Sequence, residues 1–244
     1  DYLQALYEKK LCTYPRTDSR FLTDDMAASV GNVVQYAANV LDAAMPVSLH
    51  SGQVCDSRKV TDHHAVIPTI KVRDADMDDL PVGEREILKL ICCQVLMAVS
   101  APFRFADTAV TLDCGGTAFT AKGKRVLEPG WKAYLGQSDD KPLPELTEGQ
   151  VLALNSASIA EGKTKAPAAY SEDTLLHAME TAGAKDMPED AERKGIGTPA
   201  TRAAMIEKLV SGGFVERKQN KKTVSLIPTQ IGTSLVTILP EQLQ

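Results

Sequence analysis

The chain has 244 residues, of which 43% are hydrophobic and 24% are charged, and its formal net charge is −5. These proportions are typical of a soluble globular protein with one large domain or two to three small ones. No stretch approaches the roughly 18 apolar residues that a membrane span requires, so no membrane contact is expected. The five scattered cysteines lack metal-ligand spacing. They predict a reducing, cytoplasmic location.

The first hundred residues are predicted to be mainly helical. The chain starts without Met and inside a helical pattern over 3–11, which indicates a piece cut from a longer polypeptide. A second helix is predicted over 24–41, with Thr23 as its N-cap, and a third over 82–99. We therefore expect a helical domain over residues 1–105.

The middle of the chain has the two-residue alternation of strands. Residues 109–113 and 118–121 flank the pair Gly115-Gly116, which predicts a β-hairpin. Alternation over 151–159 predicts a further strand. We expect a β-rich segment over residues 106–167.

The last part of the chain is predicted to be a helix–hairpin–helix unit. Ser171 begins one helix, a second is predicted over 198–209, a hairpin over 214–226, and a last helix from Thr229. This order is typical of a winged-helix-like domain, expected over residues 168–244. The predicted fold class is therefore multidomain α+β, with helical, β-rich and winged-helix-like parts in chain order.

Residues 13–19 read Thr-Tyr-Pro-Arg-Thr-Asp-Ser and form the most informative motif. Pro15 favours an extended conformation at Tyr14. The two-residue period of an extended chain then places Tyr14, Arg16 and Asp18 on one face. A phenol beside a guanidinium suits phosphoryl transfer, because the cation stabilises both the phenolate and the phosphoryl oxygens. On the residues alone, a tyrosine packed in a turn with a surface ion pair beside it is the favoured alternative.

The histidine and carboxylate motifs are poor metal sites. His63 and His64 are adjacent, so in an extended chain they point to opposite sides and cannot chelate together. A single histidine suits contact with a phosphate or proton transfer to a leaving hydroxyl, although most single histidines are structural. The acidic run over 74–79 has no partner carboxylate and predicts a solvated loop. No metal ligand is expected in this chain.

A basic segment over 194–222 contains seven Lys or Arg against two Glu, a local charge of +5. Thr198 is predicted to be an N-cap and Pro199 the first helical residue, after glycines that let a phosphate approach backbone N–H groups. A capped surface helix beside a solvated hairpin is the alternative interpretation. The candidate DNA-binding residues are Lys194, Thr198, Thr201, Arg202 and Lys208.

The three motifs, in this order and at about these separations, resemble type IA DNA topoisomerases, and most closely the topoisomerase III branch. The resemblance implies that Tyr14 attacks a phosphodiester of single-stranded DNA and becomes linked to the 5′ phosphate. Arg16 would stabilise the transition-state charge, and His63 would contact the phosphate or the departing 3′ oxygen. Thr17 and Asp18 would be supporting residues.

The resemblance also implies a toroidal fold and an ATP-independent isomerase that passes a strand through the break and reseals it. Members of the family hold Mg²⁺ with carboxylates of a Toprim domain that precedes the tyrosine. No segment of this chain matches that domain, so no cofactor is expected here, and we expect the isolated chain to be inactive. Its expected partners are single-stranded DNA and the N-terminal half of the same protein. Its expected location, if the protein is bacterial, is the nucleoid.

A function of another class remains open from the sequence. The chain would then be a non-catalytic winged-helix module that binds single-stranded DNA, with a purely structural tyrosine motif. Covalent attachment of DNA to Tyr14 separates the two functions.

Overall fold

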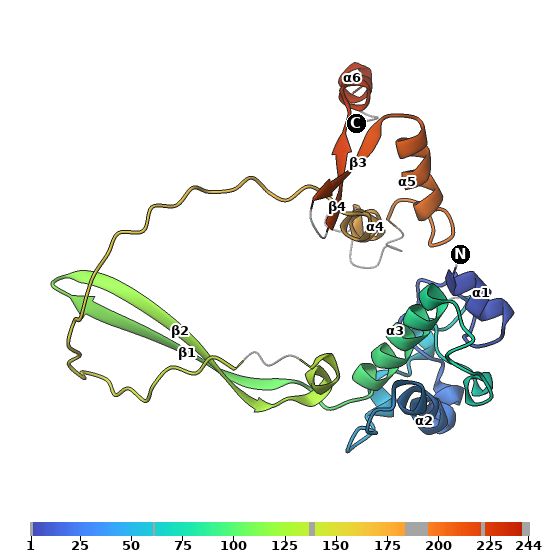
Figure 1. The fold of residues 1–244 in the computed structure, drawn as a ribbon, viewed down its shortest axis with the longest axis horizontal. Helices are drawn as coiled ribbons and strands as arrows, with labels where there is room; N and C mark the ends of the chain where they lie inside the picture. The colour runs from blue at the N-terminus through green and yellow to red at the C-terminus, as the bar shows by residue number, and fades with distance from the viewer. Residues whose placement is uncertain (1, 61, 137–139, 184–194, 221–222, 241–244) are drawn as a thin grey trace. The chain divides into compact units, whose positions relative to one another are not determined.

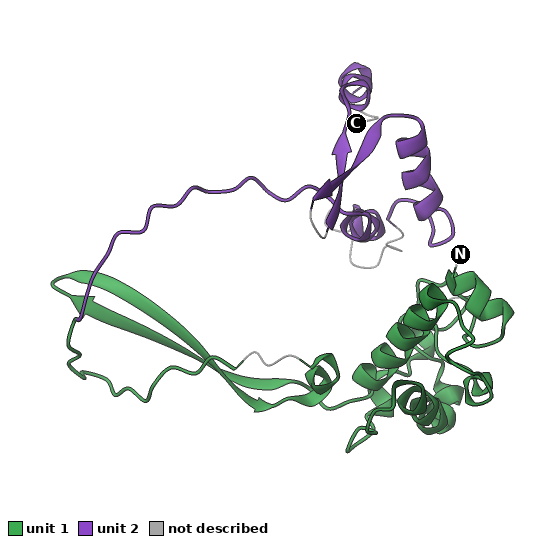
Figure 2. Cartoon of the chain, viewed as in Figure 1, with its two compact units in different colours: residues 1–154 green, residues 155–244 purple. Residues whose placement is uncertain are grey.

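The structure is a computed structural model, and it describes residues 2–60, 62–136, 140–183, 195–220 and 223–240. The chain divides into two compact units, residues 1–154 and 155–244, which are coloured separately in Figure 2. Among the described helices, none combines the length and the apolar character that a membrane crossing requires.

The first unit contains a helical part and one hairpin (Figure 1). The helix predicted over 24–41 begins with a 3₁₀ segment, and Thr23 makes no side-chain cap. The Met26 amide, which a capping Thr23 hydroxyl would bind, donates instead to the Thr23 carbonyl at 3.0 Å, as in a 3₁₀ turn. The elements of this unit are α1 (Tyr2–Glu8), η1 (Asp24–Ser29), α2 (Val30–Leu41), η2 (Ser51–Gln53), η3 (Ser57–Lys59), η4 (Ile70–Arg73), α3 (Val82–Ala98), β1 (Arg104–Cys114), β2 (Thr117–Glu128) and η5 (Gly130–Leu135).

The core of the first unit lies mainly between α2 and α3. Leu88, Cys92 and Leu96 recur every four residues along α3, so they share one helical face, and all three are fully buried. An ion pair of 2.6 Å between Lys9 Nζ and Glu84 Oε2 joins the end of α1 to the start of α3. Because Glu84 is itself buried, this pairing compensates a charge that would otherwise be costly.

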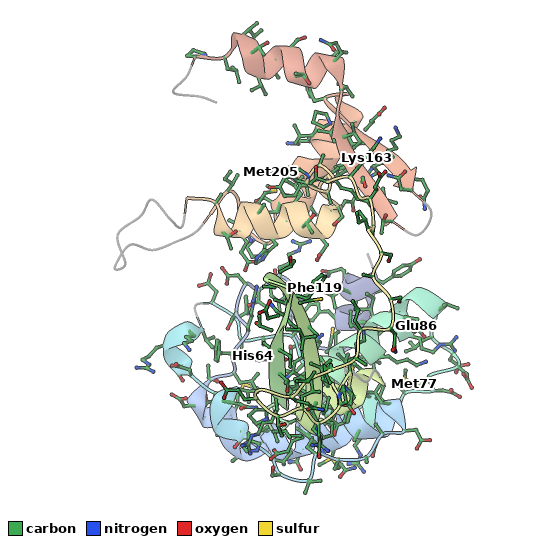
Figure 3. The ribbon with its side chains drawn as sticks, turned by 90° about the vertical axis from the view of Figure 1, so that its left-hand side faces the viewer. His64, Met77, Glu86, Phe119, Lys163 and Met205 are labelled. Atoms are coloured by element: carbon green, nitrogen blue, oxygen red, sulfur yellow. The ribbon has the colours of Figure 1, made fainter. Side chains whose placement is uncertain are left out.

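Strands β1 and β2 form the predicted hairpin, a long two-stranded ribbon (Figure 1). Gly115 and Gly116 have φ of 60° and 85°. Two consecutive residues with positive φ are what a two-residue hairpin turn of type I′ requires. Phe119, labelled in Figure 3, lies near this turn and is exposed. Most residues of both strands are exposed, so the hairpin contributes little to the core.

The predicted strand over 151–159 is absent from this structure. The segment is described throughout, but none of its backbone groups pairs with another described segment. A strand requires a neighbour for its N–H and C=O groups, and no described segment supplies one for residues 151–159. The hairpin is grouped with the helical part in one unit, and the division into three domains stays a prediction.

The second unit follows the predicted order of helices and hairpin. Ser171 Oγ accepts from the Thr174 amide at 3.2 Å in a capping box, so the predicted start of α4 is confirmed. Thr229 Oγ1 caps α6 by accepting from the Gly232 amide at 3.1 Å. The elements of this unit are α4 (Glu172–Thr181), α5 (Arg202–Ser211), β3 (Val215–Asn220), β4 (Thr223–Pro228) and α6 (Gln230–Ile238), with β3 and β4 antiparallel.

Substitution of Leu88 by Ala should lower the free energy of unfolding of the first unit by about 2–5 kcal/mol, because it leaves a cavity in the core. Leu90→Ala on the same helix is the matched control, since Leu90 is 56% exposed and should change stability by less than about 0.5 kcal/mol. Urea unfolding followed by the fluorescence of Trp131, the single tryptophan, measures both. Equal midpoints for the two variants would contradict this description of the core.

Candidate functional site

Two segments that are distant in the sequence lie side by side around Tyr14. The Thr13 amide donates to the Ile67 carbonyl at 3.0 Å, and the Ile67 amide donates to Thr13 Oγ1 at 3.0 Å across 54 residues of sequence. Further along, the Ala65 amide donates to the Phe21 carbonyl at 2.9 Å. These bonds fix the tyrosine motif at both ends against the histidine motif.

Side chains in the tyrosine motif alternate between two faces. Thr17 and Ser19 are half-buried, and Thr17 Oγ1 donates to the His63 carbonyl at 2.8 Å. Arg16 and Asp18 are exposed on the other face. Among the described residues no ion pair joins Arg16 to Asp18, so the supporting role of Asp18 stays a prediction.

The Tyr14 ring is half-buried and contacts two other rings. The His63 ring lies 4.3 Å away between centroids at 41°, and the Tyr7 ring lies 5.4 Å away in an edge-on arrangement. In the described part of the chain, no hydrogen bond joins the phenol to the imidazole. The sequence placed Tyr7 in a helical pattern but not at the site. Its position at the end of the helix that leads into the motif was the available signal.

The two adjacent histidines diverge, as the sequence predicts. His63 is exposed beside Tyr14, whereas His64 is half-buried and its Nδ1 lies 2.7 Å from the Ala65 carbonyl. His64 is labelled in Figure 3. The imidazole nearest the phenol therefore belongs to His63, the residue for which the sequence predicts a catalytic role.

The start of α5 differs from the prediction. The helix begins at Arg202, and Thr198 does not cap it. The reason is that Thr198 and Thr201 bond to each other: the Thr198 amide donates to Thr201 Oγ1 at 2.8 Å, and the two hydroxyl oxygens lie 3.0 Å apart. Residues 198–201 therefore form a turn, and both threonine side chains are exposed on it.

The three predicted basic residues of the second unit have different surroundings. Arg202 is buried, with 8% of its surface exposed, and it bonds to backbone carbonyls rather than facing solvent. Lys208 is exposed on α5. Lys194 lies outside the described residues. The Arg202 guanidinium is thus bonded inside the unit, and the predicted role of Arg202 in DNA binding stays a prediction.

Comparison with known proteins decides the family. Residues 1–244, the full chain, match the protein family described as DNA topoisomerase. The chain belongs to this family. Its curated relatives place it, as the resemblance predicted, among type IA topoisomerases that are topoisomerase III-like.

Two topoisomerase relatives show the extent of the match. DNA topoisomerase 3 of Bacillus subtilis is 36% identical over 268 residues, which cover 99% of this chain and 36% of that protein. The Vibrio cholerae DNA topoisomerase 3 is 36% identical over 263 residues, covering 99% and 39%. The topoisomerase chain thus spans a little over a third of the length of these relatives.

A solved topoisomerase shares the fold. Full-length topoisomerase I from Thermotoga maritima superposes with a TM-score of 0.63 at 20% sequence identity, covering 93% of this chain and 34% of that one. At this identity the likeness shows the fold alone.

In this topoisomerase chain, part of the basic charge of the second unit is compensated internally. Arg217 on β3 pairs with Glu172 at 2.7 Å and with Glu207 at 2.6 Å. The hydrogen bond from Arg217 lowers the pKa of the Glu207 carboxyl below its ordinary value. The charge of +5 counted along the segment therefore overstates the positive charge available to a ligand.

The topoisomerase chain offers no metal centre in its described part, since no group of three or more His, Cys, Asp or Glu could hold a metal ion there. The acidic run is a solvated loop, as predicted. Asp78 pairs with Arg85 at 3.2 Å, and Asp76 Oδ1 accepts from the Asp78 amide at 2.9 Å.

The Cys12 thiol, two residues before Tyr14 in the sequence, should be unreactive. Burial raises the pKa of the Cys12 thiol to about 11 and that of Cys92 to about 12, so both are protonated at pH 8. Iodoacetamide at pH 8 should therefore label the exposed Cys114 and spare both buried thiols. Peptide mass mapping of the native topoisomerase chain measures this. Labelling of Cys12 as fast as Cys114 would contradict it.

Proposed function

We propose that this chain carries the nucleophile of an ATP-independent type IA DNA topoisomerase, and that Tyr14 is that nucleophile. The observation that carries the proposal is the position of Tyr14, half-buried against His63, with Arg16 exposed beside it. Membership of the topoisomerase family supplies the reaction class. The activity belongs to a protein about three times as long as this chain, as the coverage of its relatives indicates.

The proposed step exchanges one phosphodiester for another. Tyr14 Oη forms a bond to phosphorus while the bond from phosphorus to the 3′ oxygen breaks. The phenol proton leaves Tyr14, and the departing 3′ oxygen gains a proton. Attack of the 3′ hydroxyl on the 5′-phosphotyrosine reverses the step after a second strand has passed. Because one ester replaces another, resealing needs no ATP.

Arg16 and His63 have separate proposed roles. Arg16 is exposed and makes no ion pair with described residues, so its guanidinium suits contact with the non-bridging oxygens of the attacked phosphate. His63 lies next to the phenol and suits contact with the same phosphate or protonation of the 3′ oxygen. Thr17 positions His63 through its bond to the His63 carbonyl.

The second unit is proposed to bind single-stranded DNA. Thr198 and Thr201 expose hydroxyl groups on one turn, and Lys208 adds a positive charge on the helix that follows. Lys194 is proposed to contribute as well, although it lies outside the described residues. Contacts of this kind are mainly to phosphates and tolerate many sequences.

Magnesium is proposed to bind to a Toprim domain of the whole protein, not to this chain. The donor set of the described residues does not fit a metal ion, because it contains no group of three suitable ligands. The roles of Tyr14, Arg16 and His63 above are therefore derived without a metal.

Tyr14→Phe should abolish covalent attachment of DNA. Labelled single-stranded DNA and Mg²⁺ are incubated with the chain alone and with the chain mixed with the N-terminal half of the protein. A denaturing gel should show an adduct only in the mixture, because the Toprim domain proposed to hold Mg²⁺ is supplied only there. Tyr170→Phe, at an exposed tyrosine of the second unit, is the matched control and should keep the adduct. An adduct that survives Tyr14→Phe would remove Tyr14 from this role.

Tyr7→Ala should slow adduct formation in the same mixture, because Tyr14 loses one of the two rings that hold its phenol. An aromatic pair contributes about 0.5–1.5 kcal/mol, which corresponds to a rate lower by up to about tenfold. Tyr7→Phe keeps the ring and should retain the rate, and Tyr2→Ala on the same helix controls for helix stability. A loss in Tyr7→Phe equal to that in Tyr7→Ala would assign the effect to the hydroxyl instead.

A further inference from the structure

The guanidinium of Arg202 is directed into the second unit. Its Nε donates to the Ile196 carbonyl at 3.0 Å, and its Nη2 donates to the Gly197 carbonyl at 3.2 Å. A guanidinium stays charged at any ordinary pH, so burial is tolerated only when its donors find acceptors. The planar fork can reach two successive carbonyls at once, which a lysine ammonium does less well.

The loop to which Arg202 bonds has a backbone conformation that residues other than glycine rarely adopt. Gly195 and Gly197 have φ of 61° and 69°, in the left-handed region that favours glycine. A Cβ on Gly195 would lie 2.2 Å from the Met179 carbonyl oxygen. The Ile196 amide donates to that same carbonyl at 2.7 Å, so the loop is attached to α4 on one side and to Arg202 on the other.

The loop leads directly into the turn that exposes Thr198 and Thr201. The Thr201 amide donates to the Thr198 carbonyl at 2.9 Å, and the hydroxyl groups of the two residues are bonded to each other. Met205, labelled in Figure 3 and located on α5, lies close to Gly197: a Cβ added there would meet its Sδ at 3.1 Å. The conformation of the turn over residues 198–201 therefore depends on the loop that precedes it, and Arg202 bonds to two carbonyls of that loop.

We infer that Arg202 is a positioning residue: from inside the second unit it holds the loop that presents Thr198 and Thr201 to single-stranded DNA. This inference rests on the proposed function. It assigns phosphate contact to Lys208, which is exposed, rather than to Arg202, which is only 8% exposed and directs its guanidinium to the two loop carbonyls.

Binding of labelled oligothymidylate to the full chain over a salt series tests the inference. Arg202→Lys keeps the charge and loses the fork, so affinity should fall about tenfold while the log–log salt slope stays as in wild type. Lys208→Gln is the matched control, and its slope should fall by about 0.7, the value of one phosphate contact to a single strand. Wild-type affinity in Arg202→Lys, or a slope lowered by about 0.7 in Arg202→Gln, would overturn the inference.

Amide hydrogen exchange separates a held loop from a general loss of folding. In Arg202→Lys the Ile196 amide should exchange faster than in wild type, whereas amides in the middle of α4 should keep their rates. Unchanged exchange at Ile196 would overturn the inference, and so would faster exchange throughout the unit. If wild type shows no salt-dependent binding at all, the proposed DNA binding fails, and the exchange comparison still decides whether Arg202 holds the loop.

Discussion

The site around Tyr14 depends on backbone pairing between two segments that lie about fifty residues apart in the sequence. The bonds of Thr13 with Ile67 and of Phe21 with Ala65 fix both ends of the motif. Without them, no local preference would bring His63 to the phenol, because neither segment belongs to a helix or a named strand. Ordering such a long closed loop is entropically unfavourable. The buried core of α2 and α3 offsets that cost, and the precision of the site therefore derives from apolar packing outside it.

Much of the first unit could be predicted from local chemistry. The helix after Pro81, the Gly-Gly hairpin and the divergence of the two histidines follow from rules that act over a few residues. The extended alternation of the motif predicted one face for Tyr14, Arg16 and Asp18, and of these Arg16 and Asp18 are exposed whereas Tyr14 is half-buried. The contact of Tyr7 with Tyr14 could not be predicted in this way, because it depends on the angle at which α1 meets the motif.

The differences between the predicted and observed surroundings of Thr198 and Arg202 in the second unit have one common cause. The sequence pattern makes Thr198 a helix cap and Arg202 a phosphate contact. Both assignments assume that the side chain binds either the neighbouring backbone or an external ligand. In the structure each has a partner inside the unit, Thr201 for one and the loop carbonyls for the other. Arg217 repeats the pattern with its two glutamates. Counting charges along a sequence cannot show which charged side chains form ion pairs or hydrogen bonds within the folded protein.

The segment over 151–159 has a consequence for the chain in solution. Its nine residues carry no charge, and Val151 and Ile159 are 94% and 96% exposed. Uncharged, partly apolar segments whose backbone groups are not paired within the protein tend to form intermolecular β-sheets. Glu148 and Glu161 flank it and oppose such association by charge repulsion. Intermolecular pairing of this connecting segment would therefore limit the solubility of the chain independently of the stability of either folded unit.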